Sequence, residues 1–198
     1  MAANERADEH ARWDVDPAGR LAVLLSGVSE MDLSSSNPMT VMDGVYMRII
    51  RAAQPNPVGK WVDRFQACVG TIVLLSNPLP CAALAELIGI TSDDVVRTLS
   101  NLHSLLAPST DNQTFRVHHK SFPDFISDPD RCVMDPPLRI DQTAHNLRIA
   151  HLCLHVMDRL LKPNLCGLEP EDWGKDRAKI LHRIEHGVSP CLAYACTY

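Results

Sequence analysis

The sequence predicts a mainly helical protein that carries one small β-hairpin. Apolar residues recur at spacings of three and four along much of the chain, which is the period of one helix face. The 14 prolines among 198 residues divide the chain into helix-length segments, because proline lacks a backbone donor and clashes with the preceding turn. Alternation typical of strands occurs at one place only. A chain of this length can bury a core without disulfides or a structural metal.

The first 78 residues are predicted to be helical after a poorly ordered, charged N-terminus over 1–17. Three helices are expected in the helical segment over 18–78, a short one first and then helices over 39–53 and 58–75, with prolines after the last two. The apolar residues expected on their buried faces are, in order, Leu21, Leu24, Leu25 and Val28; Val41, Val45, Ile49 and Ala52; and Val62, Phe65, Val69, Ile72 and Val73.

The clearest pattern in the chain is two short helices joined by a tight turn. The first is predicted over 81–88 and ends at Gly89, a residue that readily takes a positive φ. Thr91 is a capping residue for the second helix, and the carboxylates of Asp93 and Asp94 suit the positive end of its dipole. Such a pair forms a helix-turn-helix. The residues expected to face the core are Leu84, Leu87 and Ile88, then Val95, Val96, Leu99, Leu102 and Leu105.

A β-hairpin is predicted directly after these helices. Residues 105–107 and 115–118 alternate like two paired strands around a polar turn over 108–113. A hairpin in this position is the wing of a winged helix. We therefore expect a winged-helix domain over 79–127.

Residues 128–198 are expected to form a linker-helix region that the chain end truncates. Asp141 caps a long helix that runs to about Lys162, and weaker helices are predicted over 176–186 and from Pro190 onward. The buried stripe expected on the long helix is Leu147, Ala150, Leu154, Met157 and Leu161.

The charge balance disfavours nucleic acids and anionic membranes as partners. Lys and Arg number 19 against 24 Asp and Glu, which gives a net charge of −5. Between residues 80 and 120 there are three basic residues against four acidic ones, whereas DNA-binding helices need an excess of positive charge. A winged-helix DNA-binding protein is therefore the alternative interpretation. No apolar run is long enough for a membrane span, and the N-terminus is not a secretory signal, so a cytoplasmic location is expected.

The sequence lacks a phosphate-binding loop and the common hydrolase motifs. The Gly-Lys pair at 59–60 is followed by Trp61 in place of Ser or Thr. There is also no G-x-S-x-G elbow. We expect no enzymatic activity from this chain and no cofactor held by it alone.

Metal binding and disulfides have little support in the sequence. His151 and His155 are four residues apart with Cys153 between them, a spacing that can place two zinc ligands on one helix face, but no third ligand is evident. No metal site is therefore predicted. The seven cysteines contain no Cys-x-x-Cys pair, and Cys68, Cys81 and Cys153 lie in apolar segments where a thiol is typically a small core residue.

The segment that follows the predicted wing resembles a known family. The string His-Lys-Ser-Phe-Pro-Asp-Phe over 119–125 is similar to the winged-helix segment of the NACHT-type signalling ATPases that are abundant in mushroom-forming fungi. The similarity extends over about 18–198 and includes several strings in the family's order. These are 69–75 with 77–79, 84–85 with 87–90, 153–154 with Met157, and 194–198.

The resemblance implies a non-catalytic regulatory fragment of a signal-transduction ATPase. In that family the P-loop and the Mg²⁺-binding carboxylates lie upstream of this region, so ADP or ATP would be met only through a missing nucleotide-binding domain, in cis or in trans. The family's winged helix packs on that domain and helps to hold the ADP-bound form closed. Self-association through exposed helical faces is a further expectation, because the chain end would leave helix faces uncovered.

The resemblance also assigns one candidate site. A histidine at the end of the wing contacts the nucleotide phosphates in related signalling ATPases, and the matching position is His119, with His118 in the neighbouring register. An imidazole N–H can donate to a phosphate oxygen. The alternative is that the histidine only caps the following helix through Ser121.

Overall fold

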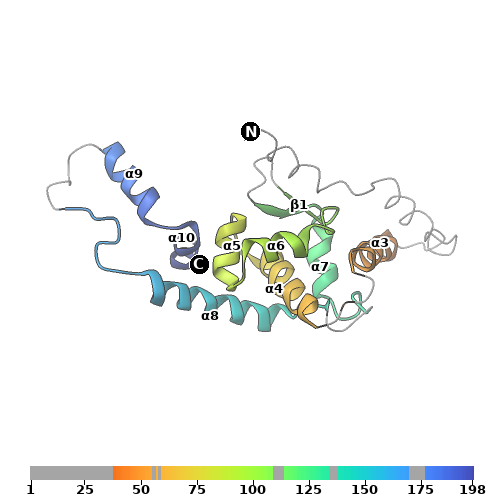
Figure 1. Ribbon diagram of the computed structural model, residues 1–198. Coiled ribbons are helices and arrows are strands. Elements are labelled where there is room, and N and C mark those ends of the chain that lie inside the picture. Colours follow the sequence, from red (N-terminus) through yellow and green to blue (C-terminus); the bar gives the residue numbers. More distant parts are fainter. Residues whose placement is uncertain (1–37, 55–56, 58, 109–113, 134–137, 170–176) are drawn as a thin grey trace, which may run out of the picture.

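The computed structural model describes residues 38–54, 57, 59–108, 114–133, 138–169 and 177–198 (Figure 1). This part of the chain is mainly helical with one two-stranded antiparallel hairpin, as the sequence predicts. The predicted short helix around 21–28 lies outside the described residues. The elements are α3 (Pro38–Ala53), α4 (Lys60–Leu74), α5 (Cys81–Ile88), α6 (Ser92–Leu99), β1 (Leu106–Pro108), β2 (Phe115–Val117), α7 (Ser121–Ser127), α8 (Gln142–Leu160), α9 (Arg177–Gly187) and α10 (Pro190–Thr197).

The order from α4 to β2 is that of a winged helix. α5 ends at Gly89, whose φ of 74° gives the left-handed C-cap that the sequence predicts. The Thr91 side chain accepts a hydrogen bond from the backbone N–H of Asp94 and so caps α6. β1 and β2 pair with Leu106 opposite Val117, and an isolated bridge joins Pro80 to the chain just before β2. The bridge adds a third short strand position, between α4 and α5, that the sequence did not indicate.

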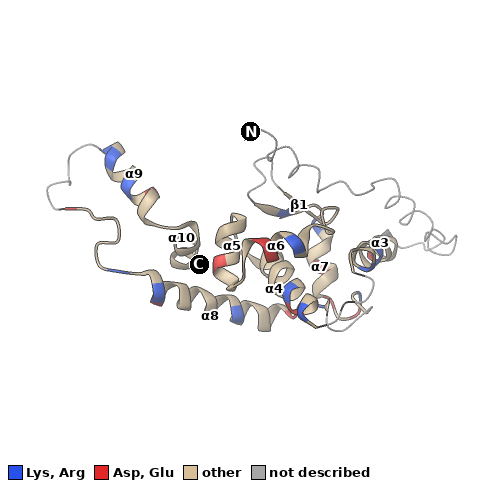
Figure 2. Ribbon diagram, viewed as in Figure 1, with Lys and Arg blue, Asp and Glu red and all other residues tan. Residues whose placement is uncertain are grey.

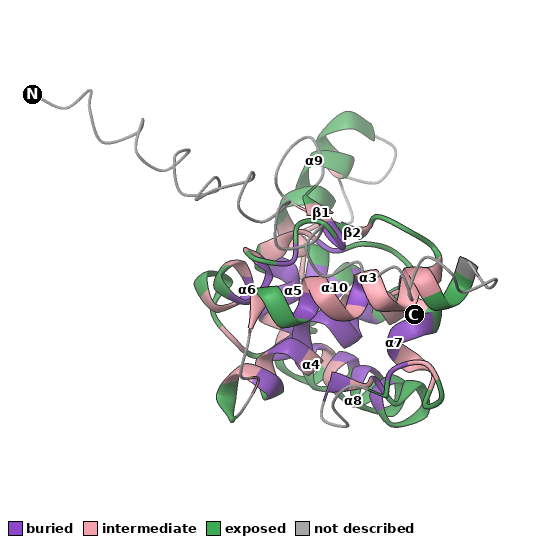
Figure 3. Cartoon of the chain, turned by 90° about the vertical axis from the view of Figure 1, so that its right-hand side faces the viewer, coloured by how far each residue is buried: buried purple, intermediate pink, exposed green. Residues whose placement is uncertain are grey.

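One hydrophobic core joins these elements. Its largest fully buried side chains come from α3 through α7, from the loops beside them and from the segment before α8. α4 contacts α5, α6 and α8, and α10 contacts α5 and α8, whereas α9 has no buried residue and lies to one side (Figures 1 and 3). The central side chains are Ile50, Phe65, Leu84, Leu87, Leu99, Leu102, Leu106, Phe122, Phe125, Ile126, Leu138 and Ile140.

The predicted extent of α6 is wrong, although four of its five predicted core residues are buried and Val96 is partly buried. α6 ends at Leu99, and Leu102 and Leu105 lie in the turns that follow. Their backbone N–H groups donate to the carbonyls of Leu99 and Leu102 at 2.8 Å. These tight turns keep both leucines buried while they redirect the chain into β1. An apolar residue every third position suits such turns as well as it suits a helix.

The buried face of α3 differs from the predicted one by one residue. Val41, Val45 and Ile49 are only partly buried and Ala52 is exposed, whereas Tyr46 and Ile50 are fully buried. The Tyr46 ring packs edge-on against Phe122, with ring centroids 5.4 Å apart. An aromatic ring buries more area than a valine side chain does, so α3 turns toward α7 to bury Tyr46.

The predicted stripe of α8 is also wrong. α8 buries His145, Ile149, Cys153 and Val156 instead, since these side chains face α4 and α10. Of the predicted stripe, only Met157 is partly buried. The residues left on the exposed side are Leu147, Ala150, Leu154 and Leu161.

The contact between α8 and α4 depends on a small residue and a buried histidine. A Cβ atom placed on Gly70 would lie 2.6 Å from His145 Cε1, so the ring occupies the space that a larger residue would need. His145 Nε2 lies 3.2 Å from Thr71 Oγ1, within hydrogen-bond distance. Burial, together with the nearby charge of Arg148, lowers the pKa of His145 from its ordinary value of 6.5. None of the described helices is long and apolar enough to cross a membrane.

Candidate functional site

The two candidate histidines lie in the short connection between β2 and α7. β2 ends at Val117 and α7 begins at Ser121, so His118 and His119 occupy an exposed corner at the end of the wing. The backbone N–H of His118 donates to the carbonyl of Leu105 at 2.9 Å and continues the hairpin ladder by one bond. The corner is therefore fixed by the hairpin on one side and by α7 on the other.

His119 belongs to a cluster of three polar side chains. Its Nδ1 lies 2.7 Å from Ser121 Oγ and 3.1 Å from the Tyr46 hydroxyl, and these two oxygens are themselves 2.7 Å apart. The backbone N–H of Ser121 also donates to Nδ1 at 3.3 Å. The three side chains of the cluster thus come from α3, from the β2–α7 connection and from the first residue of α7.

The cluster determines which nitrogen of the neutral His119 ring carries the proton. A backbone N–H can only donate, so Nδ1 must accept, and the proton then resides on Nε2. Nε2 has no hydrogen-bond partner within the part of the chain that the structure describes. Since His119 is exposed, this N–H is available to a ligand outside the chain.

Tyr46 anchors the cluster to the core. Its side chain is only 3% exposed, and its ring packs against both Phe122 and Phe125, with centroid distances of 5.4 and 5.3 Å. The hydroxyl is the one part that reaches the His119 corner. Sequence reasoning missed Tyr46. The signal that could have found it is the spacing of Tyr46 and Ile50, which lie one turn apart on the alternative apolar face of α3.

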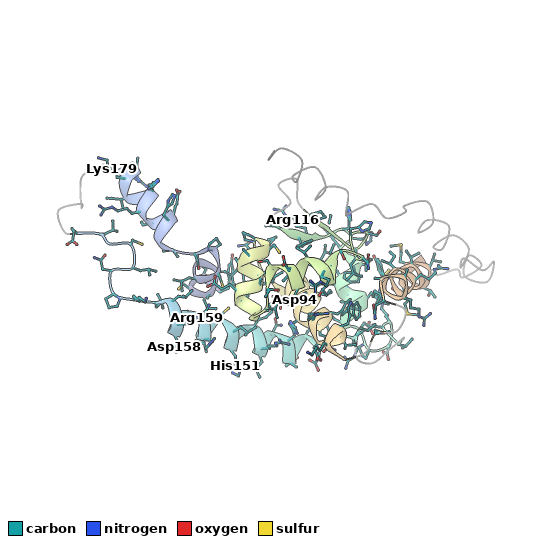
Figure 4. All side chains as sticks on the ribbon, in the orientation of Figure 1. Asp94, Arg116, His151, Asp158, Arg159 and Lys179 are labelled. Carbon is teal, nitrogen blue, oxygen red and sulfur yellow. The ribbon has the colours of Figure 1, made fainter. Side chains whose placement is uncertain are left out.

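His118 is outside this cluster. Its side chain is exposed and contacts none of the polar groups that hold His119. The structure therefore separates the two candidate residues, with one ring held at a defined angle and the other directed into solvent. Around both, residues 116–120 include Arg116 and Lys120, which are exposed, and no acidic residue. Figure 4 labels Arg116 at the β-hairpin.

The start of α6 has a different electrostatic character. Asp94 Oδ1 lies 3.3 Å from Arg64 on α4 and 3.9 Å from Arg97. Asp93 is exposed in the same turn. This turn is where a helix-turn-helix that reads DNA would approach the bases, and carboxylates there repel phosphates. Lys and Arg do not gather along α6 (Figure 2).

The histidines of α8 do not form a metal centre with the cysteine between them. His151 and His155 are exposed, whereas Cys153 is buried on the side toward the core. In the described ranges, no three His, Cys, Asp or Glu side chains are close enough to hold a metal ion.

The described cysteines are free thiols. Burial raises the pKa of Cys68 to about 12 and that of Cys191 to about 11. These two thiols therefore stay protonated near neutral pH and serve as small core residues. Cys153 is buried as well, and Cys81 is half-buried.

Comparison of the chain with protein-family models, curated proteins and solved structures finds no match. The site is therefore interpreted from its own geometry and charge.

Proposed function

We propose that this chain is the regulatory, non-catalytic part of a NACHT-type signalling ATPase, and that it acts in the cytoplasm against a nucleotide-binding domain supplied in cis or in trans. In this proposal, the end of the wing packs beside the bound nucleotide, and His119 donates a hydrogen bond from Nε2 to a phosphate oxygen of ADP. The winged helix then favours the ADP-bound state, since a ligand that binds one state better holds the population there.

The observation that carries the proposal is the fixed tautomer of His119. The Ser121 N–H, with the Ser121 and Tyr46 hydroxyls, surrounds Nδ1 and leaves Nε2–H as the exposed donor. A histidine that only capped α7 through Ser121 would need no support from a buried tyrosine 73 residues away. Such preorganisation favours binding because little side-chain entropy is lost when the ligand arrives.

The surroundings of His119 also suit an anion. Arg116 and Lys120 are exposed on either side of the histidine pair, and cationic groups near a phosphate strengthen the hydrogen bonds made to it. The start of α6, with Asp93 and Asp94, offers no comparable positive surface. Of these two ends of the winged helix, the wing corner is the better phosphate contact.

The test is ADP retention in a fusion of this chain to a nucleotide-binding domain of the same family. Loss of a hydrogen bond to a charged phosphate in His119→Ala should speed ADP dissociation by roughly ten- to a hundredfold. His118→Ala is the matched control, because its side chain lies outside the cluster, and it should leave dissociation nearly unchanged. Tyr46→Phe keeps the buried ring but removes its hydroxyl, so it should produce a smaller effect in the same direction.

Equal and negligible effects of His119→Ala and His118→Ala would contradict the proposal. The two histidines would then only shape the junction between the wing and α7.

A further inference from the structure

α8 carries an exposed row of apolar residues on the side away from the core. We call Leu147, Ala150, Leu154 and Met157 of α8, together with its C-cap residue Leu161, the leucine seam. Its three leucines are exposed by 60%, 62% and 48%. α8 runs along one edge of the molecule with α4, α5 and α10 packed on its other side (Figure 1). The described part of the chain thus leaves Leu147, Ala150, Leu154 and Leu161 exposed, whereas Met157 is partly buried and packs against the core at the edge of the row.

The seam has the spacing of a coiled coil. The three leucines are seven residues apart, and Ala150 and Met157 follow the first two after three positions. Apolar residues in this alternating three-and-four spacing occupy the a and d positions of a heptad and stay on one side of a helix over its whole length. A single surface leucine is ordinary, but a continuous row of this kind indicates a partner helix.

We propose that the leucine seam pairs with the same seam of a second copy of this chain, with the two α8 helices antiparallel about a two-fold axis at Leu154. In that register Leu154 meets Leu154 of the second copy, and Leu147 meets Leu161 of the second copy on both sides of the axis. The small Ala150 lies opposite the large Met157, again twice. Large residues opposite small ones fill the space evenly between two helices.

The charges beside the seam fit the same arrangement. His151 and Asp158 are exposed, and neither has a side-chain partner within the part of the chain that the structure describes. They follow Leu147 and Leu154 at the same heptad position. Figure 4 shows both on the outer side of α8. Arg159, by contrast, pairs with Glu86 of α5. Antiparallel helices bring equivalent flanks together, so His151 of each copy would lie beside Asp158 of the other.

A parallel pair lacks these matches. It would set Ala150 against Ala150 and Met157 against Met157, which leaves a gap in one layer and crowds another. The flanking position opposite Asp158 would be Cys153, which is buried. The sequence of α8 is therefore self-complementary in the antiparallel sense, as an isologous two-fold contact requires.

The first test is sedimentation equilibrium of the full chain over a micromolar concentration series. The native chain should form a dimer. Leu154→Glu places two like charges at the axis in place of two buried leucines, and it should raise the dimer Kd by at least roughly a hundredfold. Leu181→Glu is the control, because Leu181 is also an exposed leucine but lies on α9 (47% exposed), and it should leave the Kd unchanged. Circular dichroism verifies that both variants stay folded.

The second test distinguishes antiparallel from parallel pairing. Leu147→Cys and Leu161→Cys are prepared separately in a Cys196→Ser background, which removes the exposed native thiol. Mild oxidation of the mixture should give a covalent heterodimer, and neither variant alone should give a covalent dimer. A charge exchange supplies an independent check. His151→Asp alone should weaken the dimer, and the double variant His151→Asp/Asp158→Lys should restore it.

Three outcomes would overturn the proposal. The chain could remain monomeric throughout the series, Leu181→Glu could dissociate the dimer while Leu154→Glu does not, or each cysteine variant could cross-link by itself. None of these outcomes bears on ADP retention, so the proposed function is tested separately.

Discussion

At the scale of single residues, His145 links the stability of the protein to pH. The imidazole is buried between α4 and α8, within hydrogen-bond distance of Thr71. Burial, and then the charge of Arg148, lowers its pKa from 6.5. The unfolded chain, in which the ring is hydrated, takes up the proton more readily than the folded chain does. His145 therefore makes folding less favourable as the pH falls below about 6.5.

This linkage predicts how a conservative variant behaves. His145→Gln keeps a polar group near Thr71 but cannot titrate in this range. Urea unfolding at pH 7.5 and pH 5 should show that the native chain loses more stability between these values than the variant does. Equal losses would mean that other groups cause the pH dependence.

Tyr46 and His119 show what sequence can and cannot predict at this scale. The end of the wing could be located from the alternation of the two strands, and with it the position of His119. Tyr46 could not be assigned to the site, because its partners lie 73 and 75 residues further along the chain. Local periodicity contains no information about contacts at such a separation.

At the scale of helices, the predicted helix ends were accurate where the capping residues and the spacing of apolar residues indicated the same bounds. α5 has the predicted bounds, with Gly89 at its end, and the Asp141 side chain caps α8 by accepting from the Ala144 N–H. The predicted buried faces of α3 and α8 were wrong because both helices carry apolar residues on two sides. Which side is buried depends on the elements that pack against the helix, and for α8 these include α4 and α10. For α8, the polar His145 is buried while Leu147 and Leu154 are not.

The close contact between α4 and α8 predicts a strong effect of one methyl group. Gly70→Ala should destabilise the protein by about 1–3 kcal/mol, because the new Cβ would overlap the His145 ring, which has little room to move. Gly44→Ala is the control within α3, since its Cβ would meet only Arg48 at an ordinary 3.7 Å. It should be neutral or stabilise the protein by up to about 1 kcal/mol. Thermal unfolding measures both, and a neutral Gly70→Ala would show that α8 can shift freely.

At the scale of the whole molecule, charge argues against DNA as the partner of the winged helix. The net charge is −5, and α6 begins with Asp93 and Asp94. Mobility-shift experiments at low salt should therefore show no complex at micromolar protein. A complex whose affinity falls steeply with salt concentration would support the alternative, a winged-helix DNA-binding protein.

The attachment of α3 has a consequence for the order of folding. α3 is joined to the rest by Tyr46, which contacts the residues around the start of α7, and by Asp43, which forms a two-bond ion pair with Arg131 beyond its end, at 2.7 and 3.0 Å. These partners are separated by 73 to 88 positions along the chain. By contrast, α5 and α6 pack against each other within a segment of about twenty residues. Because long loops lose more entropy on closure, the helix-turn-helix should form early and α3 should dock late. The contacts that orient His119 would then be completed in one of the last steps on the way to the native state.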